Sequence, residues 1–502
     1  MFSIKRKAPY HHDLNQPMLR YGSNTLFLKG FFEGIFVTGS TGSGKTSGSG
    51  AYIREALLRS GAGILVLCVK PDERDAWTQA AKKAGRGTDL AFIDASPQSE
   101  RFSILDYFAA TFAANGFDRN LLLLMERLSE ALGVAKGGGS GSDDSYWENA
   151  AMRGFSNVFP LLRAAKGTIR ISDVYQMIVS APKRPEQDKD PKWQKHSFCW
   201  QVLKTLILRG KSGDKHALTL LQTHGDYWLE ELPSLAPRTR SCIESHMLTT
   251  IAPLLTGKLN EILCQDTTIV PEMLRRDGKI LIVDLPVLAY GPEGAAAQAI
   301  IKYVFGLALQ RQKLEKNARP VAIFADEYQA LISRFDADLL ATCRSSKICF
   351  TALTQDLPKL YAQLGHNKRD LVEAVIATFG TRIYHCNTCR QTNQHAAETI
   401  GKMQRYNTSR NTSWGSNSGG SLNQHEESGG SGAGDGRSQS YSEGVQSYRD
   451  FVIPPEYFAK ELRTGAKKNR YFVDAILVRN GRNFKATGEH WMKVTYRQGE
   501  YG

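Results

Sequence analysis

The chain has 502 residues, a length that suits two or three domains, and 41% of them are hydrophobic, which is enough to fill real cores. Its 64 lysines and arginines outnumber its 50 aspartates and glutamates, so the net charge of +14 favours a polyanionic partner such as nucleic acid or an anionic membrane surface. There is no run of 18 apolar residues and no N-terminal signal, and the eight scattered cysteines suit a reducing cytosol. We therefore expect a cytoplasmic globular protein without a membrane span of its own, and exclude a disulfide scaffold.

The first predicted elements surround a glycine-rich loop. A strand over residues 25–29 and a short apolar run over residues 34–38 precede residues 39–46, which read GSTGSGKT. This octapeptide fits the P-loop template G-x-x-x-x-G-K-[ST] at every fixed position, and a helical pattern follows over residues 51–58. Strand, loop and helix therefore occur in the order that a nucleotide-binding loop requires.

The residue types in this loop predict its chemistry. The glycines let successive backbone N–H groups surround phosphate oxygens, Lys45 reaches the β- and γ-phosphates, and the Thr46 hydroxyl binds Mg²⁺. We accordingly predict ATP and Mg²⁺ as cofactors. The residues predicted to bind the nucleotide are Gly39, Ser40, Thr41, Gly42, Ser43, Gly44, Lys45, Thr46 and Ser47.

Continuous apolar runs after the loop predict a parallel sheet. Residues 63–69 and 89–94 are typical of strands buried on both faces, and helical segments separate them. From about residue 111 to residue 255 the pattern is helical only, and buried strands return at residues 278–285. We predict an α/β fold, a P-loop nucleotide-binding domain in two parts (residues 1–110 and 256–502) with an inserted all-α domain (residues 111–255).

A pair of acidic residues follows the buried strand predicted over residues 321–325. Asp326 and Glu327 would lie at the carboxyl end of that strand, which we expect next to the P-loop strand. There Asp326 can hold Mg²⁺ together with Thr46, and Glu327 can orient and deprotonate the attacking water. The two residues therefore predict the hydrolytic half of an ATPase site.

Two further polar residues flank the next predicted strand. Gln355 follows residues 348–353 and can sense the γ-phosphate, although a strand-capping role fits its position equally well. Arg344 precedes the same strand; it can act as an arginine finger on a neighbouring subunit's nucleotide, or form a surface salt bridge. Position alone favours the salt bridge.

The remaining chain contains a cysteine pair, a biased segment and a terminal strand. Cys386 and Cys389 form a single C-x-x-C without a second pair, so buried free thiols are favoured over a zinc site. Residues 406–448 are rich in Ser, Gly and Asn with almost no aliphatic side chains, which predicts a mobile loop. A helix over residues 451–462 and a strand over residues 471–479 are expected after it.

The order of these motifs resembles that of the type IV secretion coupling proteins, the TraG/TraD-like conjugative DNA-transfer ATPases of the HerA and FtsK superfamily. The likeness spans about residues 25–480. It is carried by GSTGSGKT, FSILDY at 102–107, YWENAA at 146–151, KILIVDLP at 279–286, IFADEYQAL at 323–331, ALTQDLPKL at 352–360, and the Gly/Ser-rich segment before a PPE helix. This chain departs from the family in lacking initial transmembrane helices and in having Ser103 where an asparagine is usual.

The resemblance implies a fold and a function. Members have a RecA-like domain with an all-helical insert, and six subunits form a ring around a DNA channel. It implies that Lys45 and Thr46 bind ATP and Mg²⁺, that Asp326 and Glu327 are the Walker B pair, that Arg344 is the finger in trans and that Gln355 is the sensor. The expected function is a DNA-translocating ATPase that delivers DNA or nucleoprotein to a type IV secretion channel. Its implied location is the cytoplasm or the cytoplasmic side of a bacterial inner membrane.

The expected partners are DNA, bound through its backbone, other copies of the chain in a homohexamer, a relaxase or other secretion substrate, and membrane-bound secretion components. Two other functions stay open. One is a DNA pump for packaging, segregation or defence that has no secretion channel. The other is an ATP-dependent docking adaptor that recruits protein substrates and moves nothing.

Overall fold

The computed structural model describes residues 12–112, 117–135, 142–315, 317–365, 368–417 and 436–499. Its centre is a nine-stranded sheet with the order β13-β12-β9-β3-β8-β7-β4-β6-β5. The strands are β3 (Ile35–Thr38), β4 (Gly63–Cys68), β5 (Leu90–Ile93), β6 (Ile280–Asp284), β7 (Val321–Ala325), β8 (Ile348–Thr354), β9 (Thr381–His385), β12 (Phe472–Arg479) and β13 (Trp491–Arg497). All neighbouring pairs from β9 to β5 are parallel, whereas β12 is antiparallel to β9 and to β13. The predicted α/β fold with a mostly parallel sheet is confirmed.

The continuous apolar runs are explained by two large cores, one on each face of the sheet, and a third, small core lies against β9 and β12. In β4, Leu65 and Leu67 join the larger core, and Ile64 and Val66 join the smaller one. Side chains of α15 (Val287–Arg311), α16 (Phe335–Thr342) and α18 (Arg369–Ala377) fill the larger core, whereas α2 (Ala51–Arg59) and α3 (Glu73–Lys83) cover the other face. A strand buried on both faces favours apolar residues at successive positions, as in β4.

The order of the strands corrects one expectation. Strand β7, which precedes Asp326, is not next to the P-loop strand β3, because β8 lies between them and pairs with both. The carboxyl end of β8 is thereby inserted between the two halves of the predicted site. This position is what brings Gln355 close to both of them.

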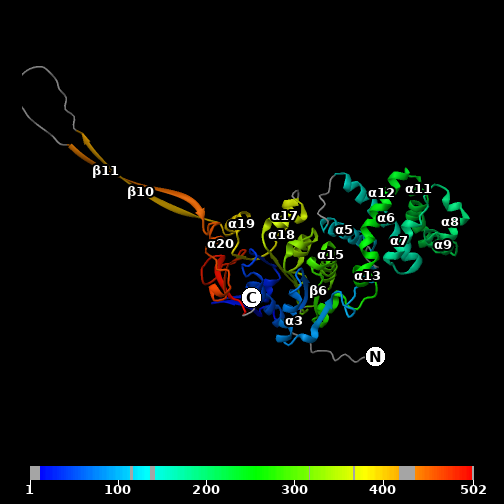
Figure 1. The fold of residues 1–502 in the computed structure, drawn as a ribbon, viewed down its shortest axis with the longest axis horizontal. Coiled ribbons are helices and arrows are strands. Elements are labelled where there is room, and N and C mark those ends of the chain that lie inside the picture. The colour runs from blue at the N-terminus through cyan, green and yellow to red at the C-terminus, as the bar shows by residue number, and fades with distance from the viewer. Residues whose placement is uncertain are drawn as a thin grey trace, which may run out of the picture.

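The described residues between β5 and β6 contain helices and no strand. They are α4 (Ile104–Phe112), α5 (Phe117–Ala135), α6 (Ser142–Lys166), α7 (Ile171–Val179), α8 (Pro191–His196), α9 (Phe198–Lys211), α10 (Lys215–Leu220), α11 (Leu232–Ser234), α12 (Pro237–Leu255), α13 (Gly257–Leu263) and α14 (Pro271–Asp277), with wide turns η4 (Leu221–Gly225) and η5 (Tyr227–Glu231). Helix α5 packs against α15 of the sheet layer, and the larger core continues from the sheet into these helices. Figure 1 shows α6 to α12 gathered at one end of the molecule. The boundaries at residues 111 and 255 remain a prediction.

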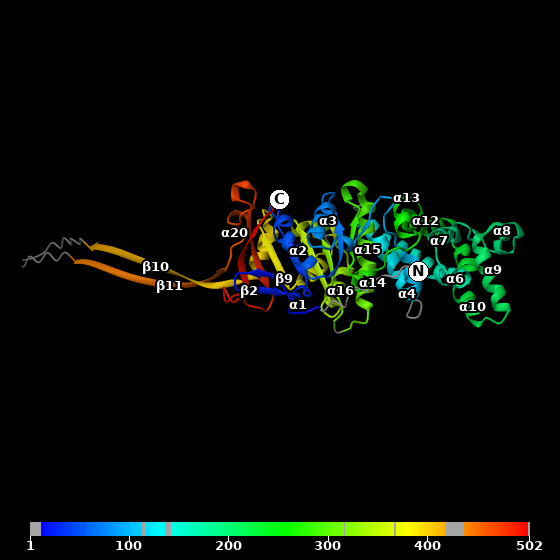
Figure 2. The same ribbon diagram turned by 90° about the horizontal axis from the view of Figure 1, so that it is seen from below.

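The Gly/Ser-rich segment differs from its prediction. The mobile loop expected over residues 406–448 is wrong for the residues that the structure describes there, which form the antiparallel strands β10 (Lys402–Asn417) and β11 (Gly436–Phe451). Residues 418–435 lie outside the described part. The prediction assumed that a strand must bury one face, but in this ribbon the cross-strand backbone hydrogen bonds form with both faces in water. Figures 1 and 2 show the ribbon as an arm that projects away from the end opposite to α6–α12.

The two faces of the ribbon differ in side-chain size. Because cross-strand partners share a face, the pairing of Trp414 with Gln439, Thr412 with Tyr441 and Tyr406 with Ser447 puts the three aromatic rings on one face. Their exposed fractions are 66–77%. The opposite face carries mainly serine, asparagine and glycine beyond its base.

The chain after the ribbon returns to the sheet. The helix predicted over residues 451–462 is shorter, because Phe451 still belongs to β11 and α20 covers only Tyr457–Lys460. Pro454 and Pro455 lack the N–H groups that an earlier helix start would use. The other small elements are β1 (Pro17–Tyr21), β2 (Asn24–Phe27), α1 (Leu28–Phe31), α17 (Leu357–Leu364) and α19 (Arg390–Ile400).

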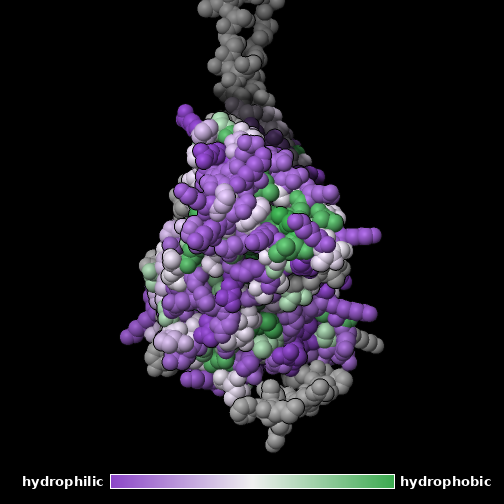
Figure 3. Space-filling view, turned by 90° about the vertical axis from the view of Figure 1, so that its right-hand side faces the viewer, coloured by the Kyte–Doolittle hydropathy of each residue, from purple (hydrophilic) through white to green (hydrophobic). Residues whose placement is uncertain are grey.

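The outer surface of the helical end is mainly hydrophilic, with separate hydrophobic areas (Figure 3). Leu208 of α9 and Leu218 of α10 are among its exposed apolar side chains. Within the described ranges, no helix combines the length and the apolar character needed to cross a membrane.

Candidate functional site

The glycine-rich loop connects β3 to a π-helical turn, η1 (Thr46–Gly50), which continues directly as α2. Gly42 and Gly44 have φ values of +76° and +81°, a backbone conformation that residues with a Cβ atom rarely adopt. A Cβ atom on Gly44 would also lie 2.6 Å from the Val473 side chain, so this position has no room for another residue. The buried Ser43 hydroxyl has no hydrogen-bond partner among the described residues, as expected for a group whose partner is a ligand.

The two predicted magnesium ligands are in direct contact. The Thr46 hydroxyl donates a hydrogen bond of 2.7 Å to Oδ2 of Asp326, which is buried at the carboxyl end of β7. Asp326 Oδ1 accepts the backbone N–H of Glu327 at 2.9 Å. The carboxylate is therefore fixed with one oxygen toward the loop, where oxygen ligands for Mg²⁺ are needed.

Glu327 lies at the centre of a cationic and amide environment. Its Oε1 atom is 3.4 Å from Lys45 Nζ and also contacts the Lys70 ammonium, and its Oε2 accepts a 3.0 Å hydrogen bond from Gln355 Nε2. Burial alone would raise the pKa of Glu327, but Lys45, Lys70 and the amide of Gln329 outweigh it and lower the pKa to about 2. The side chain is thus an ionised carboxylate throughout the neutral range.

The backbone at Glu327 is held in a left-handed conformation. Its φ of +52° is uncommon for a residue with a side chain, and such geometry persists only where surrounding contacts enforce it. The contacts here begin with a buried ion pair behind the turn, in which Lys302 Nζ and Asp336 Oδ2 are 2.6 Å apart. The Tyr328 hydroxyl donates a 2.6 Å hydrogen bond to the same Asp336 oxygen. The residue next to Glu327 is therefore anchored in the core.

The structure places Gln355 in the site and Arg344 outside it. Gln355 directly follows β8 and donates to Glu327, as described above, which fits a sensor of the nucleotide state. Arg344 is exposed and precedes β8. It therefore lies at the amino ends of the parallel strands, whereas the phosphate loop lies at their carboxyl ends. The structure thus does not bring Arg344 to the nucleotide site of its own subunit, and its role in trans stays a prediction.

Two contacts of Glu327 were missed by sequence reasoning. Lys70 lies two residues after β4, which is the neighbour of β7, so its ammonium reaches Glu327. Burial would lower the pKa of Lys70, but Asp326 and Glu327 raise it overall. Gln329 donates to Glu327 and accepts a 2.8 Å hydrogen bond from the Thr354 hydroxyl. The signal for Lys70 was its position at the carboxyl end of a buried parallel strand.

These residues enclose a pocket of about 360 Å³. This volume suits a small-molecule ligand. One wall comes from the C-terminal part of the chain, which the sequence did not indicate. The lining residues are Ser40, Thr41, Gly42, Gly44, Lys45, Thr46, Ser47, Lys70, Glu327, Gln355, Thr464, Ala466 and Gln498.

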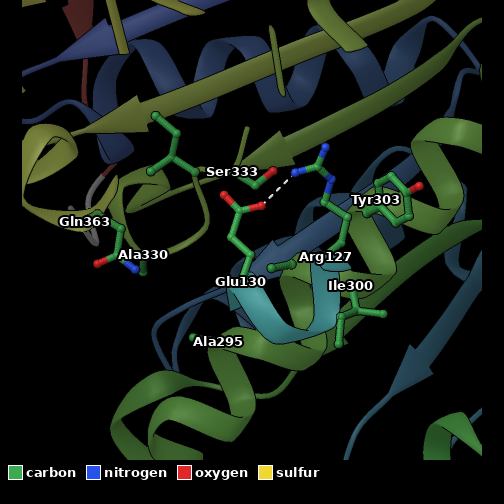
Figure 4. Close-up of a pocket in the computed structure, with 10 residues that line it drawn as sticks. Arg127, Glu130, Ala295, Ile300, Tyr303, Ala330, Ser333 and Gln363 are labelled. Atoms are coloured by element: carbon green, nitrogen blue, oxygen red, sulfur yellow. Dashed lines mark hydrogen bonds and ion pairs between the residues drawn. The ribbon is translucent and has the colours of Figure 1, made fainter. Parts of the chain in front are cut away.

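A second hollow lies between α5, α15 and the segment after Tyr328 (Figure 4). Its volume is about 30 Å³, room for a water molecule and not for a nucleotide. Arg127 and Glu130, one turn apart on α5, line it and form an ion pair at 2.9 Å, and Glu130 also lies 3.4 Å from Arg334. The phosphate-loop pocket is therefore the better candidate for ligand chemistry.

The cysteine pair shows no metal geometry. Cys386 is buried at the end of β9 and its thiol contacts the Ala459 carbonyl at 3.7 Å. Burial raises the pKa of Cys386, which keeps the thiol protonated. Within the described ranges, no three histidine, cysteine, aspartate or glutamate side chains are arranged to hold a metal ion.

Comparison with known proteins gives one family match and a set of similar folds. Residues 320–446 match the family model described as "TraM recognition site of TraD and TraG". This range includes Asp326, Glu327, Arg344 and Gln355. No curated protein sequence matches the chain.

The fold is similar to that of the bacterial conjugative coupling protein TrwBdeltaN70 in its unbound form, with a TM-score of 0.61 at 14% identity, over 96% of this chain and 89% of that one. TrwB in complex with ADP and Mg²⁺ gives 0.60 at 14% identity, and TrwB with the ATP analogue ADPNP gives 0.59 at 13% identity; each comparison covers 96% of this chain and 90% of the other. The fold is thus shared over nearly the whole described chain.

Proposed function

This chain resembles the type IV coupling proteins of the TraG/TraD kind over residues 320–446 and shares the fold of TrwB, and on that premise we propose that it is an ATP-hydrolysing, DNA-translocating coupling protein. Its substrate would be DNA or nucleoprotein, delivered to a conjugation channel. We further propose that it works as a homohexamer in the cytoplasm, next to membrane-bound secretion components.

The observation that carries this proposal is the hydrogen bond between Thr46 and Asp326. It joins the phosphate loop to the carboxylates at the end of β7 across the intervening β8, beside the pocket of about 360 Å³. Structures of TrwB with an ATP analogue and with ADP and Mg²⁺ support the choice of ligand. When bound, Mg²⁺ would neutralise phosphate charge between Thr46 and Asp326.

The side chains then have distinct tasks in hydrolysis. Lys45, now 3.4 Å from Glu327, would turn its charge to the phosphates and leave Glu327 free to accept a proton from the attacking water. The low pKa of Glu327 is a consequence of its lysine partners, so loss of Lys45 to the phosphates would raise that pKa and make the carboxylate a better base. Gln355 would report the change to α17 through Asp356, the residue that caps this helix.

We also propose contacts with a neighbouring subunit and with DNA. Arg344 would complete the site of an adjacent subunit, since in its own subunit it lies away from the phosphate loop. Loops that line a central channel would hold the DNA backbone with little sequence preference, and the net charge of +14 suits such contacts. A relaxase or another nucleoprotein would be the cargo.

An ATPase assay of the full chain tests the proposal. We expect turnover that single- or double-stranded DNA stimulates, loss of binding and turnover in Lys45→Ala, and loss of turnover with retained nucleotide binding in Glu327→Gln. Lys82→Ala, an exposed lysine on α3, is the matched control. Normal turnover in both site variants would remove the proposed site.

A docking adaptor is the second candidate function. The family description names a recognition site for the protein TraM, which favours a surface that recruits a protein. For such an adaptor, ATP would order the assembly without DNA-stimulated hydrolysis. Nucleotide binding together with an absence of DNA binding at low salt would support this function over translocation.

A further inference from the structure

Gln498, near the end of the chain, forms a bridge across the candidate nucleotide pocket. It is buried directly after β13, and its Nε2 atom donates a 2.6 Å hydrogen bond to the hydroxyl of Ser47 at the helix side of the phosphate loop. On the other side, its Oε1 accepts the backbone N–H of Ala466 at 2.9 Å. The same amide therefore contacts two walls of the pocket.

The orientation of this amide is fixed by its partners. A backbone N–H can only donate, so the atom facing Ala466 must be the amide oxygen, and the atom facing Ser47 must be the NH₂ group. Gln498 consequently acts as a donor toward Ser47. Its own backbone N–H donates to the Tyr471 carbonyl at 2.8 Å, which holds the residue in place.

The consequence for Ser47 follows from the chemistry of a hydroxyl, which has one proton to donate and two lone pairs to accept. One lone pair is occupied by Gln498, and the Ser47 proton makes no hydrogen bond to the described residues. The proton is therefore available to an acceptor in the pocket. Phosphate oxygens are acceptors only, so a hydroxyl kept as a donor suits them.

The wall that holds Gln498 has a strained backbone. Ala466 has φ +59° and ψ 176°, a region that is essentially restricted to glycine, and Arg470 and Tyr471 also have positive φ values. Gly465 fits only because it lacks a side chain, since a Cβ atom there would lie 2.2 Å from Gln498 Oε1. Strained backbone of this kind clusters at functional sites, and here it accompanies the hydrogen bond from the Ala466 N–H to Gln498.

We propose that Gln498 is a positioning residue for the nucleotide, which keeps the Ser47 hydroxyl as a hydrogen-bond donor to the phosphate chain. The inference rests on the proposed nucleotide-binding function and assigns a role to a wall that contains no nucleotide motif. It predicts that nucleotide binding is weakened more by a side chain at position 498 that accepts a hydrogen bond from Ser47 than by removal of the side chain.

The variant Gln498→Glu makes this reversal. A carboxylate only accepts, so it would take the Ser47 proton and also add a negative charge near the phosphates. We expect the full chain with Mg²⁺ to bind fluorescent mant-ADP at least about tenfold more weakly in Gln498→Glu, and about two- to fivefold more weakly in Gln498→Ala. Gln446→Glu, on the exposed ribbon, has the same change of net charge and should bind as the native chain does.

A double-mutant cycle with Ser47→Ala isolates the hydroxyl. Without that hydroxyl, the Gln498→Glu change should cost several-fold less than it does in the native chain. Competition against mant-ADP by inorganic tripolyphosphate should weaken as much as competition by ADP, because the lost contact is to phosphate. Melting temperatures of all variants are measured in parallel.

Each alternative result has a defined meaning. Equal losses in Gln498→Ala and Gln498→Glu, with equally lowered melting temperatures and no change in the Ser47→Ala background, would make the residue structural and overturn the inference. Unchanged tripolyphosphate competition would also overturn it. A native chain that binds no mant-ADP would instead remove the proposed function, and this inference with it.

Discussion

The Lys302 ammonium and the Asp336 carboxylate lie 2.6 Å apart with both side chains fully buried behind the segment that carries Glu327. Tyr328 and Ser333 donate to the same carboxylate, and Lys302 also donates to the Leu331 carbonyl. The pair thus holds the turn after β7 at two points, the backbone carbonyl of Leu331 and the side chain of Tyr328. The geometry of Glu327, the carboxylate proposed to act as the base, therefore depends on a cluster outside the candidate nucleotide pocket.

Breaking this pair should destabilise the protein strongly. Lys302→Met leaves an unpaired buried carboxylate, and we expect a loss of about 3–5 kcal/mol, visible as a markedly lower melting temperature in differential scanning fluorimetry. Arg410→Met breaks the exposed pair of Arg410 and Glu443 on the ribbon, for which about 0–1 kcal/mol is expected. Similar shifts in the two variants would contradict the structural role given to Lys302.

The acid limb of the activity profile should depend on Lys70. Glu327 has a pKa of about 2 partly because Lys70 contacts it, so Lys70→Met raises that pKa toward the ordinary value. A higher pKa means that the carboxylate is protonated at a higher pH. The acidic limb of kcat/KM should therefore move up by roughly one pH unit, as expected for loss of one close opposite charge.

The check for Lys70 is a pH profile of ATP hydrolysis from about pH 2 to pH 8 for the native chain and for Lys70→Met, since the acidic limb of the native chain is expected near the Glu327 pKa of about 2. Circular dichroism at each pH confirms that both chains are folded. Lys82→Met, exposed on the neighbouring helix, provides the control for a lost lysine charge. A profile that stays in place after removal of Lys70 would show that its contact with Glu327 is absent in the working state.

A finger that acts in trans predicts complementation between two inactive variants. Arg344→Ala subunits keep an intact phosphate loop, and Lys45→Ala subunits keep Arg344. Mixed assemblies should recover part of the native ATPase rate, because some interfaces then combine one intact loop with one intact finger. The rate is measured across mixing ratios, and additivity of two residual rates at every ratio would exclude the role in trans.

Removal of the ribbon should leave the rest of the fold intact. Arg405 and Tyr448 are cross-strand partners, so residues 406–447 can be replaced by Asn-Gly, a sequence suited to a two-residue hairpin turn. Because the described side chains beyond this pair, those of residues 406–414 and 439–447, are exposed, we expect an unchanged melting temperature and unchanged mant-ADP affinity. Ile453→Ala, in the small core below the ribbon, should lower the melting temperature and serves as the positive control.

The sequence was sufficient for those parts of the molecule that depend on local pattern. The P-loop and the buried strands are recognisable because a glycine turn and continuous apolar runs have few other interpretations. Lys70 and Gln498 could not be placed in this way, because their contacts follow from the order of strands in the sheet. Gln498 reaches the phosphate loop only because β12 and β13 extend the sheet beyond β9.

The ribbon was mispredicted for a different physical reason. Composition indicated that residues 406–448 bury no core, and the described side chains at 406–414 and 439–448 are exposed, but a lack of burial does not by itself exclude strands. Here β10 and β11 contain two threonines, three tyrosines, Trp414 and Val445, and these residue types favour extended backbone even in a solvated ribbon. A segment without buried side chains can therefore still form paired strands.

The projecting ribbon also has a hydrodynamic consequence. Strands of 16 residues reach roughly 50 Å at about 3.3 Å per residue, yet they add little mass. The arm therefore raises the frictional coefficient of the chain well above that of a compact particle of 55.7 kDa, and gel filtration will overstate its size. Subunit number is best read from light scattering or sedimentation equilibrium, in which the arm counts only by its mass.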